Sequence, residues 1–411
     1  MKKIIIAVLC LCFAGATNAQ EGCQYFSELV SGKEIAVLRS TGQPLNGTVC
    51  QFVGNGRLFR ETPYKNGKKE GIEKQYHENG NLASETPYKD GKQEGIRKIY
   101  SQSGGLYAET LYTDGEPEGT ERHYYSESGK LQFETSSKPE GISRLYYESG
   151  KLMAEAPFWG TSDSSWIFGK PETQFDISPA MGVKADGIVK KYYENGNLHS
   201  ETPYKESELD GIRKYYYESG KLAHERFFKG GKQEGIERIY YESGKLESET
   251  PYKDDKQEGI ERRYFESGKP MSEEPYKNGK AEGIAKHYYE SGNLEFETPY
   301  ENGKAEGIAK HYYESGKLES EIPYKNDELE GLSRSYFENG TLRNEFLHEG
   351  GKSVYFRRVD GNGRLSWKIL TRDNELLSGV CGNGRVLTEE DIINFPKVPC
   401  DLDLPQSGES R

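Results

Sequence analysis

Three histidines occupy the same place in a motif that recurs along the chain. His123, His287 and His311 each lie four residues after a glycine that follows a glutamate. Histidines at a regular spacing suggest a zinc site. If each motif is a pair of strands, however, equivalent histidines lie two strands or about 10 Å apart. Two ligands that share one zinc ion at about 2 Å cannot span that distance, so we interpret them as histidines on a strand surface and expect no metal site.

Glutamates recur in the same motif and raise the question of acid–base chemistry. Each has a basic residue at a fixed spacing, which indicates ion pairing, and catalytic carboxylates are rarely repeated ten times in one chain. The sequence contains no nucleophile elbow, phosphate-binding loop or metal signature. We therefore expect no enzyme, no catalytic residue and no cofactor.

The motif belongs to a repeat that covers most of the chain. A fixed period of 20–50 residues indicates a repeat architecture, in which each unit buries its apolar face against its neighbours. The chain of 411 residues is only 33% hydrophobic and includes 30 tyrosines, which suits such an array better than a deep core. The repeat glycine, with steps of 24 residues in eight of ten intervals, is found at Gly71, Gly95, Gly119, Gly141, Gly187, Gly211, Gly235, Gly259, Gly283, Gly307 and Gly331.

The repeat has the features of a β-hairpin. With the glycine as position 1, residues 235–258 read GIERIYYESGKLESETPYKDDKQE. Ser243-Gly244, at positions 9 and 10, fits a two-residue hairpin turn, so that facing positions add up to nineteen. Position 4 is basic in every unit of the main array, and position 15 is glutamate in all but the Gly119 unit, where an extra turn residue displaces Glu134 by one. These facing charges predict the register of the hairpin.

The same register predicts the remaining contacts. Glutamate at position 8 should face lysine at position 11, as in Glu242 and Lys245, and an aromatic residue at position 7 should face leucine at position 12, as in Tyr241 and Leu246. Isoleucine at position 2 and tyrosine at position 6 should lie on the opposite face. A second turn, at the KNGK or KDGK sequences, would lead into the next unit. We expect an all-β fold: an elongated, twisted antiparallel meander of 24-residue hairpins, up to about 130 Å long.

The unit G-I-x-K/R-x-Y-Y-E-S-G-K-L-x-x-E-x-P-Y-K-N-G-K resembles the bacterial variant of the MORN repeat, from about Gly47 to Glu349. The resemblance implies a hairpin-forming module without catalytic residues. Bacterial proteins with this variant are often described as antitoxin components of toxin–antitoxin systems, and MORN repeats in general as scaffolds for proteins or lipids.

The N-terminus predicts export. Lys2 and Lys3 precede an apolar run and the stretch GATNA, typical of a secretory signal cleaved after Ala19. The expected organisation is a signal peptide at 1–19, an N-terminal cap with a degenerate repeat at 20–56, and the array at 57–349 with an irregular insertion at 157–186. Degenerate repeats and a C-terminal cap follow at 350–400, then a flexible tail at 401–411. We expect a periplasmic or secreted protein.

Four cysteines remain after removal of the signal, and none lies in the regular repeats. Cys23 and Cys50 lie near one end, and Cys381 and Cys400 near the other. This placement favours one disulfide in each cap. Unpaired buried thiols are the alternative, whereas a four-cysteine zinc site does not fit two pairs at opposite ends without short spacings.

The net charge and the residues of the insertion indicate which class of partner the protein binds. The formal net charge of −12, or −14 without Lys2 and Lys3, disfavours nucleic acid and anionic membrane surfaces. A protein or glycan partner remains. The insertion carries Trp159, Trp166, Phe168 and Phe175, residue types that are enriched at interaction hot spots; the alternative is a decayed repeat that packs in line.

Three functions are consistent with these features. The first is an exported scaffold, without enzymatic activity, that binds a protein partner at the cell envelope or outside the cell. The second is an antitoxin or immunity protein that neutralises a toxin. The third is a glycan- or cell-wall-binding module, although such modules usually have tryptophan in the repeat and the regular units here have none.

Overall fold

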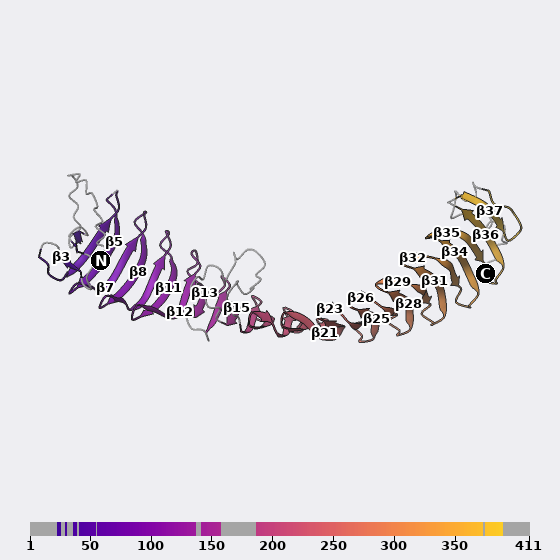
Figure 1. The fold of residues 1–411 in the computed structure, drawn as a ribbon, viewed down its shortest axis with the longest axis horizontal. Coiled ribbons are helices and arrows are strands. Elements are labelled where there is room, and N and C mark those ends of the chain that lie inside the picture. The colour runs from indigo at the N-terminus through magenta and orange to yellow at the C-terminus, as the bar shows by residue number, and fades with distance from the viewer. Residues whose placement is uncertain are drawn as a thin grey trace, which may run out of the picture. The chain divides into compact units, whose positions relative to one another are not determined.

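A computed structural model describes residues 23–25, 29–30, 36–38, 41–54, 56–136, 141–157, 186–372 and 375–388. The chain divides into an N-terminal unit, residues 1–184, and a C-terminal unit, residues 185–411. The described residues of both units form β-strands joined by tight turns, and none of them is helical (Figure 1). It follows that no helix among them is long and apolar enough to cross a membrane.

In the N-terminal unit the strands follow one another as antiparallel hairpins. An additional strand, β1, pairs in parallel with β4 and places Tyr25 opposite Cys50. The strands are β1 (Cys23–Tyr25), β2 (Leu29–Val30), β3 (Val37–Leu38), β4 (Gly47–Phe52), β5 (Leu58–Lys65), β6 (Lys68–Lys69), β7 (Gly71–Tyr76), β8 (Leu82–Lys89), β9 (Lys92–Gln93), β10 (Gly95–Tyr100), β11 (Leu106–Thr113), β12 (Glu116–Tyr124), β13 (Leu131–Ser136), β14 (Ile142–Tyr146) and β15 (Leu152–Pro157).

The C-terminal unit continues the same pattern. Its strands are β16 (Gly187–Tyr192), β17 (Leu198–Lys205), β18 (Glu208–Leu209), β19 (Gly211–Tyr216), β20 (Leu222–Lys229), β21 (Lys232–Tyr240), β22 (Leu246–Lys253), β23 (Lys256–Gln257), β24 (Gly259–Tyr264), β25 (Pro270–Lys277), β26 (Lys280–Ala281), β27 (Gly283–Tyr288), β28 (Leu294–Glu301), β29 (Lys304–Ala305), β30 (Gly307–Tyr312), β31 (Leu318–Lys325), β32 (Glu328–Leu329), β33 (Gly331–Tyr336), β34 (Leu342–Glu349), β35 (Lys352–Val359), β36 (Leu365–Arg372) and β37 (Glu375–Cys381).

The predicted register is confirmed in the middle of each hairpin. Arg238 at position 4 lies directly opposite Glu249 at position 15, and the displaced Glu134 still faces Arg122. The glutamate also faces the basic residue of the following repeat, as Glu273 does with Lys286. The all-β array of 24-residue hairpins is therefore confirmed.

The first turn differs from the two-residue prediction. Tyr241 N–H donates to the Lys245 carbonyl at 2.9 Å and Gly244 N–H to the Tyr241 carbonyl at 2.8 Å. Three residues therefore form the loop, and only Gly244 among them has a positive φ, 92°. A type I turn followed by a glycine in a positive-φ conformation is the usual three-residue hairpin.

This loop changes the pairing beside it. The register shifts between Ile239 and Tyr240, so that Leu246 at position 12 faces Tyr240 at position 6 and not Tyr241 at position 7. The predicted pairing of positions 7 and 12 is therefore wrong, and the leucine lies on the face of positions 2 and 6.

The second turn, which connects one repeat to the next, is a two-residue turn. Asn278 and Gly279 both have positive φ, 52° and 77°, which identifies a type I′ turn. The turn also joins neighbouring repeats: Asn278 N–H donates to the Glu258 carboxylate at 2.7 Å and Gly279 N–H to the Gln257 carbonyl at 2.9 Å.

The repeat glycine is required for two reasons. Gly259 has a φ of 121°, and a Cβ built on it would lie 2.9 Å from Cγ of Pro251 at position 17 of the preceding repeat. Proline in a strand is tolerated where it interrupts the ladder, and the Pro251 carbonyl still accepts from Glu258 N–H at 3.0 Å. Glycine and proline thus lock each repeat against the previous one.

Buried apolar side chains larger than alanine are few among the described residues. Leu45, Val49 and Cys50 are buried near the N-terminus. Trp367, Ile369, Cys381 and Leu387 form a core cluster in the C-terminal unit, with Phe356 packed against it.

Candidate interaction surfaces

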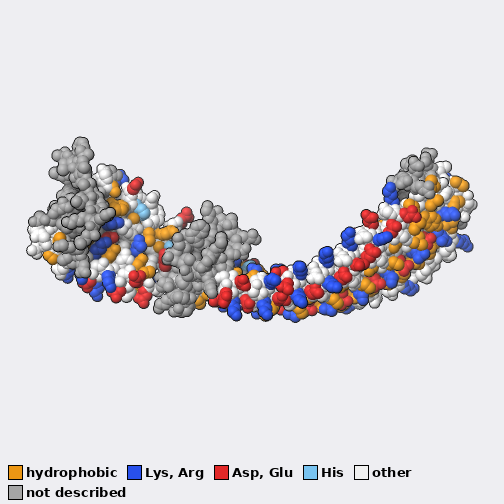
Figure 2. Space-filling model, in the orientation of Figure 1, with side chains coloured by type: hydrophobic (Ala, Val, Ile, Leu, Met, Phe, Trp, Pro, Cys, Tyr) orange, Lys and Arg blue, Asp and Glu red, His pale blue; other side chains and the backbone are white. Residues whose placement is uncertain are grey.

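Each hairpin presents two faces, because alternate residues of a strand point to opposite sides of the sheet and directly opposed residues share a side. Positions 2, 4, 6, 15, 17 and 19, together with position 12, form what we term the isoleucine face. Positions 3, 5, 14, 16 and 18 form the histidine face. Figure 2 shows basic and acidic side chains interspersed along the visible side of the C-terminal unit.

The glutamates of the isoleucine face are tied into a ladder. Arg238 contacts Glu249 of its own repeat (Nε–Oε1 2.9 Å) and Glu225 of the preceding one (Nη1–Oε1 3.2 Å). Such partly exposed pairs add little stability each but specify the register. The carboxylates thus have structural partners, as expected from the basic residues at position 4.

Tyrosine at position 6 completes this ladder. The Tyr76 hydroxyl donates to Glu61 of the preceding repeat at 2.8 Å. Burial, followed by this hydrogen bond and the carboxylate charge, raises the pKa of Tyr76 to about 12. The same contact recurs at Tyr100, Tyr124, Tyr216 and Tyr312.

In each unit exposed apolar residues line this face beside the charge ladder. Nine isoleucines at position 2 are 40–53% exposed: Ile72, Ile96, Ile142, Ile188, Ile212, Ile236, Ile260, Ile284 and Ile308. Each faces a proline, leucine or phenylalanine at position 17, as Ile284 faces Pro299 and Ile212 faces Phe227. We call these paired residues the isoleucine row. The sequence analysis predicted which face holds position 2. It did not predict that the residue opposite, at position 17, is apolar.

Side chains at the three-residue loops connect successive repeats. The Tyr241 hydroxyl donates to the Tyr264 carbonyl of the next repeat at 2.7 Å. Lys245 Nζ donates to the Glu266 carbonyl at 2.8 Å and, because of the loop shape, does not face Glu242 in the ladder. The predicted pairing of positions 8 and 11 is therefore corrected to a contact between repeats.

The three histidines stack on aromatic rings of the histidine face. His287 and His311 lie on either side of Phe296, with ring centroids at 4.1 and 5.4 Å. His123 stacks on Phe133 at 4.1 Å, and its Nε2 is 2.7 Å from Glu121 Oε1. Across the described residues no group of three or more His, Cys, Asp or Glu side chains is placed to hold a metal ion.

One charged cluster on this face was not predicted. Glu237 at position 3 is only 7% exposed and accepts hydrogen bonds from His224 Nε2 (2.7 Å), Gln233 Nε2 (2.8 Å) and Arg226 Nε (3.2 Å). Burial alone would raise its pKa, but these donors and the Arg226 charge lower the pKa of Glu237 to about 2. All four residues differ from the small or apolar set at equivalent positions of a later repeat, Phe296, Thr298, Ala305 and Ala309.

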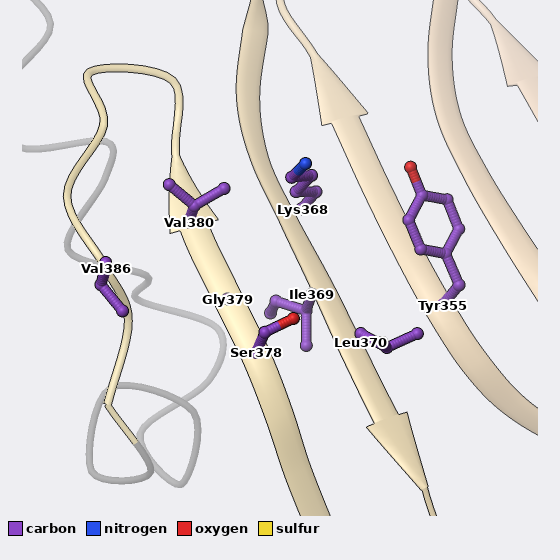
Figure 3. A pocket seen from close by; sticks show the side chains of 8 residues that line it. All are labelled: Tyr355, Lys368, Ile369, Leu370, Ser378, Gly379, Val380 and Val386. Atoms are coloured by element: carbon purple, nitrogen blue, oxygen red, sulfur yellow. The ribbon is translucent and has the colours of Figure 1, made fainter.

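A cavity of about 430 Å³ lies in the C-terminal unit (Figure 3). Its lining side chains come from β35, β36, β37 and the segment after β37: Tyr355, Lys368, Ile369, Leu370, Ser378, Gly379, Val380 and Val386. The lining is mostly apolar, with the Lys368 ammonium as its one formal charge. Nothing in its arrangement provides a nucleophile with an adjacent base.

The predicted partner-binding residues Trp159, Trp166, Phe168 and Phe175 lie outside the described residues, as does Cys400. Cys50 and Cys381 are buried, and Cys23 lies on β1. The pairings of Cys23 with Cys50 and of Cys381 with Cys400 stay predictions.

Comparison with known families agrees with this geometry. The model of the MORN repeat variant matches residues 69–90, 139–159, 185–206, 209–229, 233–254, 257–278, 281–302, 305–326 and 329–349. The chain therefore belongs to the MORN-repeat-variant proteins, a family of repeat sheets that are generally not catalytic.

Other comparisons add little. No curated protein matches the chain. Among solved structures it is similar to the crystal structure of TcdB2-TccC3-TEV (13% identity, TM-score 0.15, 82% of this chain and 21% of that chain). It is likewise similar to the Photorhabdus luminescens Tc holotoxin pore (14% identity, TM-score 0.14, 84% and 20%). The chain spans about a fifth of the length of those chains, and likenesses this weak carry no argument about its fold or function.

Proposed function

We propose that this protein is an exported scaffold, without enzymatic activity, that binds a partner protein at the cell envelope or outside the cell. The observation that carries the proposal is the isoleucine row. A single exposed isoleucine is ordinary on a protein surface, but apolar residues that recur on one face of successive repeats indicate an interaction site. Because the row repeats with the hairpins, each added repeat enlarges the contact area.

The other candidate functions relate to this proposal in different ways. Neutralisation of a toxin protein would be one instance of partner binding, and the identity of the partner would decide it. Glycan binding has less support, because the position 7 tyrosine hydroxyls that sugars would use donate to backbone carbonyls, as in Tyr241 and Tyr313.

Affinity capture with matched variants tests the proposed function. The mature protein from Gln20, immobilised and exposed to envelope and culture fractions, should retain a defined partner. Ile260→Ser combined with Ile284→Ser and Ile308→Ser should reduce retention about tenfold, because the three changes together remove apolar contact area from the row. Ser267→Ala with Ser291→Ala and Ser315→Ala, on the loop side of the same repeats, should not.

A Trp159→Ala and Trp166→Ala variant belongs in the same experiment. If the insertion supplies specificity, this variant should lose at least about 2 kcal/mol of binding free energy. Equal retention by the wild type, the isoleucine variant and the tryptophan variant would contradict both assignments.

Export and the disulfides make a separate prediction. Protein recovered from the periplasm or the medium should begin at Gln20, and unreduced peptide mapping should link Cys23 to Cys50 and Cys381 to Cys400. In the loop-entropy model each bond would contribute about 3 kcal/mol. Recovery of a chain that retains residues 1–19, or of four alkylatable thiols, would rule this out.

A further inference from the structure

The isoleucine row of the C-terminal unit has a fixed period. Six consecutive repeats each contribute one exposed isoleucine: Ile188, Ile212, Ile236, Ile260, Ile284 and Ile308. Equivalent residues lie two strands apart, which is about 9.6 Å. A ligand that contacts every repeat must therefore offer an apolar group about every 9.6 Å.

Charge lies along one side of the row. At three of the six second turns that follow these isoleucines a lysine faces a glutamate across positions 19 and 22, and at a fourth Lys232 is paired with Asp254. At the other two turns lysines are directly opposed at these positions, Lys253 with Lys256 and Lys277 with Lys280. All four are exposed. Figure 2 shows basic side chains along the margin of this unit where Figure 1 labels β26, β29 and β32.

These four lysines make no ion pair with another described residue, whereas the nearby acids are engaged. Asp254 accepts from Lys232 at 2.7 Å, and Glu258 accepts from the Asn278 N–H. Like charges directly opposed across strands are destabilising, so an anionic ligand would relieve the repulsion. On the other side of the row the arginines and lysines of position 4 already have glutamate partners.

The period discriminates among the backbone conformations of a ligand. A β-strand repeats a side chain on one face every ~6.6 Å, and an α-helix brings residue i+7 back to the same face after ~10.5 Å. Polyproline II has three residues per turn and repeats every ~9.3 Å, the smallest mismatch with the row. Neighbouring strands are also rotated by about 20–25° on average, and an extended chain follows a turning row more easily than a straight helix does.

We propose that the isoleucine row of the C-terminal unit binds an acidic, extended segment of a partner protein in the polyproline II conformation, with an apolar residue at every third position. Three residues per turn direct one side chain to the isoleucine row, the next toward the lysine pairs and the third to solvent. The inference rests on the proposed function and names the kind of segment that the partner presents.

A synthetic peptide of six Leu-Asp-Pro triplets, one for each exposed isoleucine of the unit, tests the proposal. Binding of the fluorescein-labelled peptide to the mature full chain, measured by anisotropy, should strengthen with each added triplet and weaken as salt is raised. A peptide with leucine at every fourth residue and the same charge should bind at least about tenfold more weakly, because its side chains fall out of step with the row.

Two protein variants separate the contributions. The triple Ile260→Ser, Ile284→Ser, Ile308→Ser variant should weaken binding at least about tenfold, since each isoleucine loses apolar contact. Lys253→Gln with Lys256→Gln, Lys277→Gln and Lys280→Gln should weaken binding and flatten its salt dependence. The serine-to-alanine control described above should behave as the wild type, and circular dichroism checks that every variant is folded.

Other outcomes overturn the proposal. They are tighter binding of an acidic amphipathic helix with leucines at heptad spacing, self-association of the protein that the isoleucine variant abolishes, and triplet binding that the row variants leave unchanged. If the captured partner depends on the row but contains no such segment, this inference fails while the proposed function stands. If capture depends on neither the row nor the insertion, the proposed function fails as well.

Discussion

Gly259→Ala should lower the free energy of unfolding by about 3 kcal/mol, whereas Gly268→Ala should lower it by about 1 kcal/mol. Both glycines have a positive φ, 121° and 89°, which costs any other residue free energy. Only at Gly259 does the new Cβ also meet another atom, Pro251 Cγ at 2.9 Å, while nothing lies within 4 Å of the Cβ position at Gly268. Chemical denaturation followed by circular dichroism measures the difference.

A double-mutant cycle isolates the steric part. Pro251→Ala removes the Cγ atom, so the combination with Gly259→Ala should be less destabilising than the sum of the two changes. Hydrogen exchange should show the loss of protection concentrated around β22–β24, because contacts in a repeat array reach only neighbouring units. Equal effects at Gly259 and Gly268 would mean that the contact between glycine and proline does not join the repeats.

Glu237→Ala should destabilise the protein by about 2–3 kcal/mol, because it leaves Arg226, His224 and Gln233 without their shared acceptor. The full cost of an unpaired buried charge is not expected, since the Arg226 side chain is 38% exposed and water can reach it. Thermal and chemical denaturation at neutral pH would show the loss.

The same cluster predicts a pH dependence. The pKa of Glu237 is lowered in the folded protein from 4.5 to about 2, so its contribution is present above pH 4.5 and is lost as the pH falls from there toward 2. Glu237→Gln should reduce this acid sensitivity. An unchanged stability profile between pH 5 and about 2 in that variant would contradict the assignment.

A natural repeat provides the matched control. His224→Phe, Arg226→Thr, Gln233→Ala and Glu237→Ala together reproduce the set formed by Phe296, Thr298, Ala305 and Ala309. Replacing a whole buried charged group by packed residues is often neutral or stabilising. The free energy of unfolding of the fourfold variant should therefore lie within about 1 kcal/mol of the wild-type value. This is expected although the variant contains Glu237→Ala, which is destabilising alone.

The centre of each hairpin could be predicted because charge complementarity at positions 4 and 15 admits only one register. The loop beside it could not, because Ser243-Gly244 is compatible with both a two-residue and a three-residue turn. The two turns differ in the backbone hydrogen bonds that close the loop. With the three-residue turn, Leu246 faces Tyr240 and not Tyr241. Opposed charges near a turn, such as Glu242 and Lys245, are therefore weaker evidence than those in the middle of strands.

The apolar row and the Glu237 cluster escaped prediction for different reasons. Position 17 is usually proline, and a proline within a strand could have indicated close packing against the repeat glycine. The Glu237 cluster depends on His224 and Arg226, which replace the small residues usual at positions 14 and 16. It also depends on the register shift in the pairing of β20 with β21, which the sequence does not reveal. The insertion with Trp159 and Trp166 has no repeat to define its register, so its contribution to binding stays a prediction.

The short sequence separation between hydrogen-bonded groups affects how an exported chain would fold. Side-chain hydrogen bonds between neighbouring repeats, such as those of Tyr193 and Tyr217, span 23 residues along the chain. Folding of such a chain avoids the entropic cost of closing long loops. A hairpin can form its contacts as soon as the following one has emerged, so in an exported chain the ordered part would lengthen in steps of one repeat, from the first hairpin toward the last, as the chain leaves the translocation channel.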